Sequence, residues 1–171
     1  MWLFNEQIAS WSAIADADDV VLVDLAEYND VDKIVAKLNE TQTILEAGYQ
    51  VDKARYYWAG WSAGGNLAII IAAQNQGLVA GTLVFPGTGG NLALDSMKAN
   101  TGHNLRLFYA CGDADPNFAW AAVENEAKVW GSMGYGTKFV KVSGAPHYLD
   151  EATYGVRATG WDWMREFNLA N

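Results

Sequence analysis

Residues 57–66 contain the motif Gly-x-Ser-x-Gly, with Ser62 at its centre, between an apolar aromatic run and a run of helix-forming residues. In this setting the motif predicts a tight turn from a strand into a helix, with the serine hydroxyl at its apex projecting out of the fold. Gly60 and Gly64 are small enough for the backbone to make that turn. The motif alone occurs by chance in many proteins, so the prediction depends on the strand before it and the helix after it.

Strand-like and helix-like segments alternate along the whole chain of 171 residues. This alternation implies a parallel sheet with helices on both faces, and the length fits one domain spanning residues 1–171. We therefore expect an α/β fold: a three-layer α/β/α arrangement with a mainly parallel five-stranded sheet. The expected strands are 20–25, 55–59, 79–85, 105–111 and 137–142; the expected helices are 2–15, 31–48, 62–76, 92–99, 117–133 and 152–169.

Composition excludes several classes of protein. The net charge of -9 argues against nucleic acid as a partner, because phosphate binding needs clustered Lys and Arg. Cys111 is the single cysteine, so no internal disulfide can form, and we expect it to be a small buried side chain at the end of a strand. No apolar run has the length of a membrane span. Residues 1–6 lack the basic region of a signal peptide, which predicts a cytoplasmic protein unless Met1 replaces a longer natural N-terminus.

A serine nucleophile needs a base, and the chain has only two histidines. His103 precedes an expected strand, whereas His147 follows one. Because ligands bind at the carboxyl ends of parallel strands, His147 is the candidate base and His103 is expected to be a solvated loop residue.

The base in turn needs a carboxylate that orients it. Asp113 and Asp115 both follow the expected strand 105–111 directly, so the position of that strand leaves both as candidates. Aspartate is also favoured as a helix cap or turn residue, and we expect one of the two to have only that role.

The order Ser62, Asp115, His147 resembles that of the α/β-hydrolase family, in which the nucleophile is followed by the acid and then by the histidine. The acid loop of that family resembles residues 112–115 and so selects Asp115; the histidine loop resembles residues 144–147. The resemblance covers nearly the whole chain and is strongest to the esterase branch, which includes feruloyl and acetyl esterases and polyester depolymerases. It implies hydrolysis of a small-molecule carboxylic ester through an acyl-enzyme, without a cofactor, with the Ala63 N–H in the oxyanion hole. A peptidase of the prolyl oligopeptidase type is the lesser alternative.

The expected helix at 2–15 departs from the family, whose members have a central strand and an oxyanion loop before it. Without that strand, we expect five parallel strands in sequential order, with 20–25 beside 55–60, and possible dimerisation through the free edge of 20–25. The helices between strands should cover one face, and the terminal helices the other. The second oxyanion donor is then open between the backbone of Trp2 or Leu3 and the residues Asn5, Tyr28 and Asn29. This gap favours, as the alternative function, a weak or inactive hydrolase-like module that binds a ligand or partner.

Two further features lie near the expected site. Trp61, next to the nucleophile, is expected either to line the substrate site or to pack in the core. The glycine-rich residues 87–90 lack the lysine and the spacing of a phosphate-binding loop, so we expect an ordinary loop. No cluster of residues has the spacing of a metal site.

Overall fold

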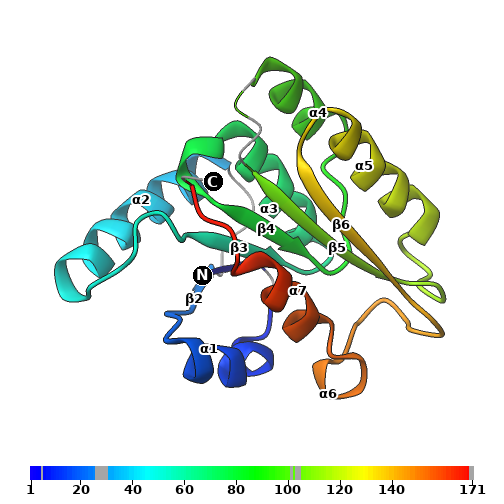
Figure 1. The fold of residues 1–171 in the computed structure, drawn as a ribbon, viewed down its shortest axis with the longest axis horizontal. Coiled ribbons are helices and arrows are strands. Elements are labelled where there is room, and N and C mark those ends of the chain that lie inside the picture. The colour runs from blue at the N-terminus through cyan, green and yellow to red at the C-terminus, as the bar shows by residue number, and fades with distance from the viewer. Residues whose placement is uncertain (5, 26–30, 101, 103–104, 170–171) are drawn as a thin grey trace.

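The computed structural model describes residues 1–4, 6–25, 31–100, 102 and 105–169. Six parallel strands form one sheet in the order β2-β1-β3-β4-β5-β6 (Figure 1). The strands are β1 (Trp2–Phe4), β2 (Val23–Leu25), β3 (Tyr57–Gly60), β4 (Gly81–Val84), β5 (Arg106–Gly112) and β6 (Gly136–Val142). The parallel α/β architecture is as predicted, but the sheet has six strands rather than five.

The additional strand, β1, corrects the start of the expected helix at 2–15. Trp2 pairs with Val23 on one side and with Trp58 on the other, so β1 separates the two strands that were expected to be neighbours. Only the later part of that range is helical, as the 3-10 helix η1 (Ile8–Trp11) and the helix α1 (Ser12–Asp18). A strand that is buried on both faces appears in the sequence as a continuous apolar run, and its periodicity does not distinguish it from a buried helix.

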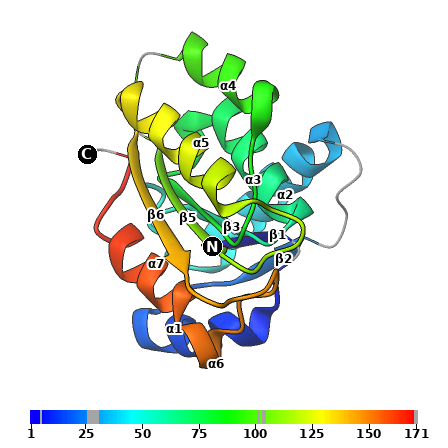
Figure 2. The ribbon, with the colours of Figure 1, turned by 90° about the vertical axis from the view of Figure 1, so that its right-hand side faces the viewer.

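The helices form one layer on each face of the sheet (Figure 2). One layer contains α2 (Val31–Gly48), α3 (Ala63–Gln74), α4 (Gly90–Ala99) and α5 (Trp120–Ser132); the 3-10 turn η2 (Gln76–Leu78) follows α3. The other contains η1, α1, α6 (Glu151–Tyr154) and α7 (Val156–Met164). The prediction that the terminal helices share one face is confirmed.

Each face of the sheet has its own hydrophobic core, because successive side chains of a strand point to opposite faces. In β1, Trp2 and Phe4 belong to the core on the side of α2 to α5, whereas Leu3 belongs to the core on the side of η1, α1 and α7. Cys111 in β5 is fully buried, as expected, and burial raises the pKa of its thiol to about 12.

The edge of the sheet at β2 is the place at which the sequence predicted pairing with a second copy. β2 is the outermost strand in the structure, and dimerisation there stays a prediction.

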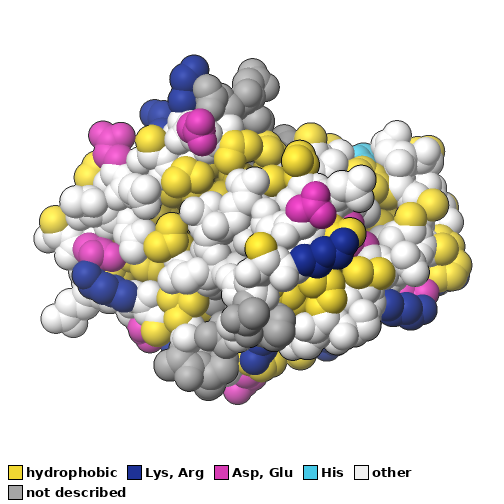
Figure 3. Space-filling model, turned by 90° about the horizontal axis from the view of Figure 1, so that it is seen from above, with side chains coloured by type: hydrophobic (Ala, Val, Ile, Leu, Met, Phe, Trp, Pro, Cys, Tyr) yellow, Lys and Arg dark blue, Asp and Glu magenta, His cyan; other side chains and the backbone are white. Residues whose placement is uncertain are grey.

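Across the described part of the chain, every helix is too short or too polar to traverse a bilayer. On the face drawn in Figure 3, the visible Lys and Arg side chains are dispersed and several lie beside Asp or Glu.

Candidate active site

Ser62 lies in the turn between β3 and α3 and has a strained backbone, with φ of 55° and ψ of -122°. Two backbone hydrogen bonds fix this turn: the Ser62 N–H donates to Pro86 O at 2.9 Å, and the Trp61 N–H donates to Phe4 O at 3.1 Å. A Cβ atom at Gly60 would lie 2.4 Å from Gly64 O, so only glycine fits there. The predicted strand–turn–helix is therefore present, and its strain at a serine is typical of functional sites.

The strain at Ser62 predicts a difference in stability between two variants. Glycine adopts a positive φ without steric cost, whereas alanine does not. We expect Ser62→Gly to be more stable than Ser62→Ala by about 1 kcal/mol, since the strain is relieved only in the former. Urea unfolding of the two variants measures this difference, and equal stabilities would contradict it.

His147 lies in the loop after β6, and its Nε2 atom is 2.9 Å from Ser62 Oγ. The Trp61 indole N–H donates to the His147 carbonyl at 3.2 Å. Aromatic rings flank the imidazole: Phe118 is parallel to it at 5.7 Å between ring centroids, and Trp61 is tilted at 5.2 Å. These contacts hold the ring with one nitrogen toward the serine. Sequence reasoning did not single out Phe118, although it follows Asp115 by three residues.

Asp115 contacts the other imidazole nitrogen, with 2.9 Å between its Oδ2 and His147 Nδ1. Its Oδ1 accepts hydrogen bonds from the N–H groups of Asn117 and Phe118, at 2.7 and 3.1 Å, and the side chain is fully buried. Both carboxylate oxygens are thus used, one to fix the acid and one to orient the histidine. The structure brings together the three predicted residues Ser62, Asp115 and His147.

Asp113 does not have the cap or turn role expected for one of the two aspartates; Asp115 itself accepts the local turn hydrogen bonds, and Asp113 contacts another loop. Its Oδ1 accepts a hydrogen bond of 2.6 Å from the Gly144 N–H, at the start of the histidine loop, and Lys141 lies 3.4 Å from its Oδ2. The Gly144 hydrogen bond lowers the pKa of the Asp113 carboxyl. Asp113 therefore joins the acid loop to the histidine loop without contacting the imidazole.

The structure is compatible with one of the predicted oxyanion donors and argues against two others. Ala63 is the first residue of α3, so its N–H has no acceptor within the helix. Trp2 is buried inside β1, two residues before the carboxyl end of the strand, and is not at the start of a helix. We therefore withdraw Trp2 and Leu3 as oxyanion donors. The remaining candidates, Asn5, Tyr28 and Asn29, lie outside the described residues, as does His103.

The glycine-rich loop after β4 is held by side chains of neighbouring helices. The carboxylate of Glu126 accepts hydrogen bonds from the Gly89 and Gly90 N–H groups at 2.8 and 3.1 Å, and Asn66 Oδ1 accepts from Thr88 N at 2.7 Å. These donors are thus occupied within the protein, as expected for an ordinary loop. Among the described residues, no group of three or more His, Cys, Asp or Glu side chains is placed to hold a metal ion.

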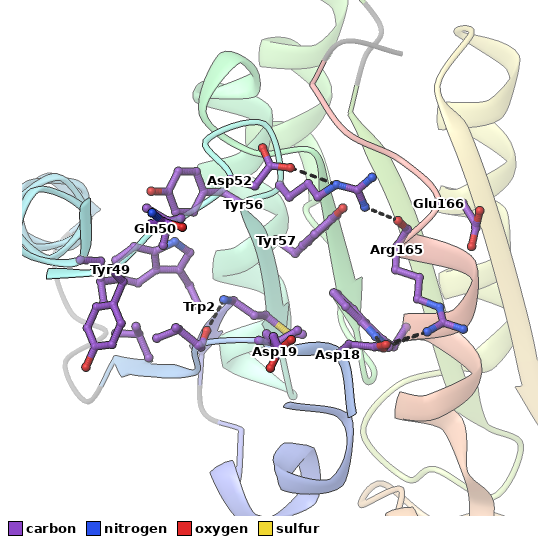
Figure 4. A pocket seen from close by; sticks show the side chains of 18 residues that line it. Trp2, Asp18, Asp19, Tyr49, Gln50, Asp52, Tyr56, Tyr57, Arg165 and Glu166 are labelled. Atoms are coloured by element: carbon purple, nitrogen blue, oxygen red, sulfur yellow. Dashed lines mark hydrogen bonds and ion pairs between the residues drawn. The ribbon is translucent and has the colours of Figure 1, made fainter. Parts of the chain in front are cut away.

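A cavity of about 690 Å³ lies at the amino ends of the strands, where β1, β2 and β3 begin, whereas Ser62 follows the carboxyl end of β3. Figure 4 shows Trp2 and Tyr57 among its lining residues, with Arg165 reaching toward Asp18. None of the three residues Ser62, Asp115 and His147 lines this cavity.

No protein-family model matches the sequence, and no curated protein is significantly similar to it. Solved structures resemble the chain over most of its length. A phospholipase/carboxylesterase of Dyadobacter fermentans is 17% identical, with 93% of this chain and 86% of that chain covered and a TM-score of 0.66. A carboxylesterase of Bacillus cereus is 14% identical, with coverages of 96% and 86% and a TM-score of 0.65.

The chain has the α/β-hydrolase fold. A third α/β-hydrolase neighbour, a protein of Butyrivibrio proteoclasticus, was solved with ferulic acid bound. It is 14% identical, with coverages of 96% and 87% and a TM-score of 0.66. In this fold, β1 lies inside the sheet between β2 and β3, where the sequence was expected to lack a strand.

Proposed function

We propose that this protein is a serine hydrolase that cleaves carboxylic esters through an acyl-enzyme. The observation that carries the proposal is the pair of hydrogen bonds that joins Ser62 to His147 and His147 to Asp115. Each contact to the imidazole measures 2.9 Å. A hydrogen-bonded nucleophile, base and orienting acid at the carboxyl ends of parallel strands are the parts that acyl transfer needs. The esterases among the solved structures of the same fold support this choice of reaction.

In the proposed mechanism, Ser62 Oγ attacks the ester carbonyl while His147 Nε2 takes its proton. Asp115 holds the imidazole in the correct tautomer and stabilises its positive charge. The protonated His147 then donates to the leaving alcohol, and a water activated by the same histidine releases the acid. The Ala63 N–H stabilises the negative charge on the carbonyl oxygen of both tetrahedral intermediates.

We assign the second oxyanion donor to a backbone N–H at Glu6 or Gln7, just after β1. The Trp61 N–H donates to Phe4 O, so the chain leaves β1 directly beside the turn that carries Ser62. Removing one such donor typically lowers the rate by about 10² to 10³. The alternative, an inactive binding module, was favoured by the missing oxyanion loop; β1 supplies the strand that leads into such a loop and so weakens that argument.

Aromatic side chains around the base favour an ester with an apolar acyl or alcohol group. Trp61, Phe118 and Tyr148 are each partly buried, and Trp61 contacts both His147 and Tyr148. Apolar and aromatic walls with a few placed polar groups are typical of small-molecule sites.

The two neighbouring aspartates provide a matched test of the proposal. Asp115→Asn leaves the shape of the site intact but presents an amide to His147 Nδ1, so we expect kcat for a short p-nitrophenyl ester to fall by about 10³ to 10⁴. Asp113→Asn should keep kcat within about tenfold, because Asp113 does not contact the imidazole. Steady-state kinetics on both folded variants measures this. Equal losses, or no turnover by the unaltered protein, would count against the proposed triad.

A further inference from the structure

Among the residues that the structure describes, the most deeply buried ion pair is formed by Glu6, two residues after β1, and Arg157, the second residue of α7. Both side chains have no exposed surface. Arg157 Nε donates to Glu6 Oε2 at 2.8 Å, and its Nη2 donates to Glu6 Oε1 at 3.0 Å. The Trp11 indole N–H also donates to Glu6 Oε2, at 3.1 Å. This fork geometry fixes the position of Glu6 relative to α7.

Arg157 extends the network to the loop that carries His147. Its Nη1 donates to the Leu149 carbonyl at 2.6 Å, two residues beyond the histidine. The guanidinium also lies 5.8 Å from the centre of the Tyr148 ring. Residue Gln7 makes a parallel link, because its Oε1 accepts a 3.1 Å hydrogen bond from the Tyr148 hydroxyl. The segment after β1 and the histidine loop are therefore joined twice.

The same guanidinium also contacts the segment that follows β4. It is 5.3 Å from the centre of the Phe85 ring, and the next residue, Pro86, accepts the Ser62 N–H. Three segments of the site thus converge on Arg157: the chain after β1, the end of β4 and the histidine loop. These segments are far apart in the sequence, and one side chain holds them together.

Stability alone does not account for a fully buried ion pair. Removing two charges from water costs about as much as their attraction returns, and an apolar pair of similar volume is often as stable or more so. A bidentate pair of arginine and carboxylate does, however, fix the geometry between the two elements that it joins. Here those elements carry the base and, in the proposed function, the second oxyanion donor.

We propose that Glu6 and Arg157 are positioning residues, which fix the backbone after β1 against the histidine loop and so fix the distance between oxyanion donor and base. The inference rests on the proposed ester hydrolase. Neither side chain touches the reacting atoms; both act through the backbone of residues 6–7 and through His147. A displacement of about 1 Å in such a site can lower the rate by about 100-fold.

The test is the double variant Glu6→Leu with Arg157→Met, which removes both charges and leaves neither unpaired. We expect kcat for a p-nitrophenyl ester to fall by roughly 10- to 100-fold with little change in KM, because the oxyanion donor acts mainly in the transition state. The thermal midpoint should fall, because the buried Trp11 indole N–H and the buried Leu149 carbonyl lose their partners. Activity is therefore compared at a temperature at which circular dichroism shows the variant to be folded, so a loss of folding does not explain the lower kcat.

The matched control lies at the other end of α7, where Arg165 Nη1 is 2.9 Å from Asp18 at the end of α1. Asp18→Asn with Arg165→Met breaks a second ion pair to the C-terminal helix, in the lining of the cavity where β1, β2 and β3 begin, which Ser62 does not line (Figure 4). We expect kcat of this control to equal that of the parent.

A parental kcat in the Glu6 and Arg157 double variant would overturn the inference and leave the proposed function intact. Absence of Ser62-dependent turnover in the parent would instead overturn the proposed function, and the inference with it. If the double variant does not fold, Arg157→Lys decides. It keeps the charge but not the simultaneous bonds to Glu6 and Leu149, so we expect a lower midpoint and, in the folded variant, a reduced kcat with unchanged KM. Parental kcat in this variant contradicts the inference.

Discussion

Replacing Ser62 by alanine should lower kcat for a short p-nitrophenyl ester by about 10⁴- to 10⁶-fold, because the proposed reaction forms its covalent intermediate on this hydroxyl. Nothing else at the tip of the turn can replace the nucleophile, while His147 and Asp115 keep their places. The fold should persist, since Ser62 N–H and not its side chain bonds to Pro86. Steady-state kinetics together with circular dichroism measures both expectations.

Ser132→Ala is the matched control for the loss at Ser62. Ser132 is exposed at the end of α5, and its hydroxyl only donates to Val129 O of its own helix. Its variant should retain the parental kcat. Equal activity of the Ser62→Ala and Ser132→Ala proteins would contradict the assignment of the nucleophile.

The second large effect is expected at Gly112, where the acid loop crosses the histidine loop. A Cβ atom at this position would lie 2.0 Å from Ala145 O and 2.8 Å from Pro146 O, one residue before the base. Gly112→Ala must therefore push the two loops apart, which we expect to cost about 3 kcal/mol of stability. The same displacement separates His147 from Asp115, so kcat should fall by about 100-fold.

Urea unfolding and kinetics of Gly112→Ala measure these two effects, with Gly77→Ala as the matched control. A Cβ atom at Gly77 meets no other atom within 4 Å, so the control should match the parent in both measurements. Alkylation of Cys111 adds a local readout, because its buried thiol, with a pKa of about 12, should react only when the end of β5 opens. If Gly112→Ala were alkylated at Cys111 as slowly as the parent and were equally stable, the close packing of the two loops would be contradicted.

The proximity of the three proposed triad residues was predictable because of a general property of parallel sheets. The carboxyl ends of all strands meet at one edge, so residues that follow successive strands are neighbours whatever the intervening helices do. The positions of Ser62, His147 and the pair Asp113 and Asp115 after successive strands therefore predicted their proximity without knowledge of the packing. The choice between Asp113 and Asp115 required the resemblance, and the structure supports Asp115, whose Oδ2 is 2.9 Å from His147 Nδ1.

The strand β1 was not predictable from local pattern. Trp2, Leu3 and Phe4 form a three-residue strand whose apolar run continues into Ile8 and Trp11 at helical spacing. Its identity as a strand depends on pairing with Val23 and Trp58, which are distant in the sequence. Propensity is a weak signal where such tertiary pairing decides.

The Glu6–Arg157 pair was invisible for a similar reason. The two residues are 151 positions apart, and each is of a type that is usually exposed. The two residues are partners only because the segment after β1 and the helix α7 lie on the same face of the sheet. Long-range polar contacts of this kind have no signal in a single sequence.

The central claim, that Ser62 is an activated nucleophile, is tested most directly by a fluorophosphonate probe followed by peptide mass spectrometry. An activated serine forms a covalent phosphonyl ester, whereas ordinary surface serines such as Ser132 do not react. The account predicts a single adduct on the peptide that contains Ser62, lost in His147→Ala. Absence of any adduct at Ser62 on folded protein would contradict it.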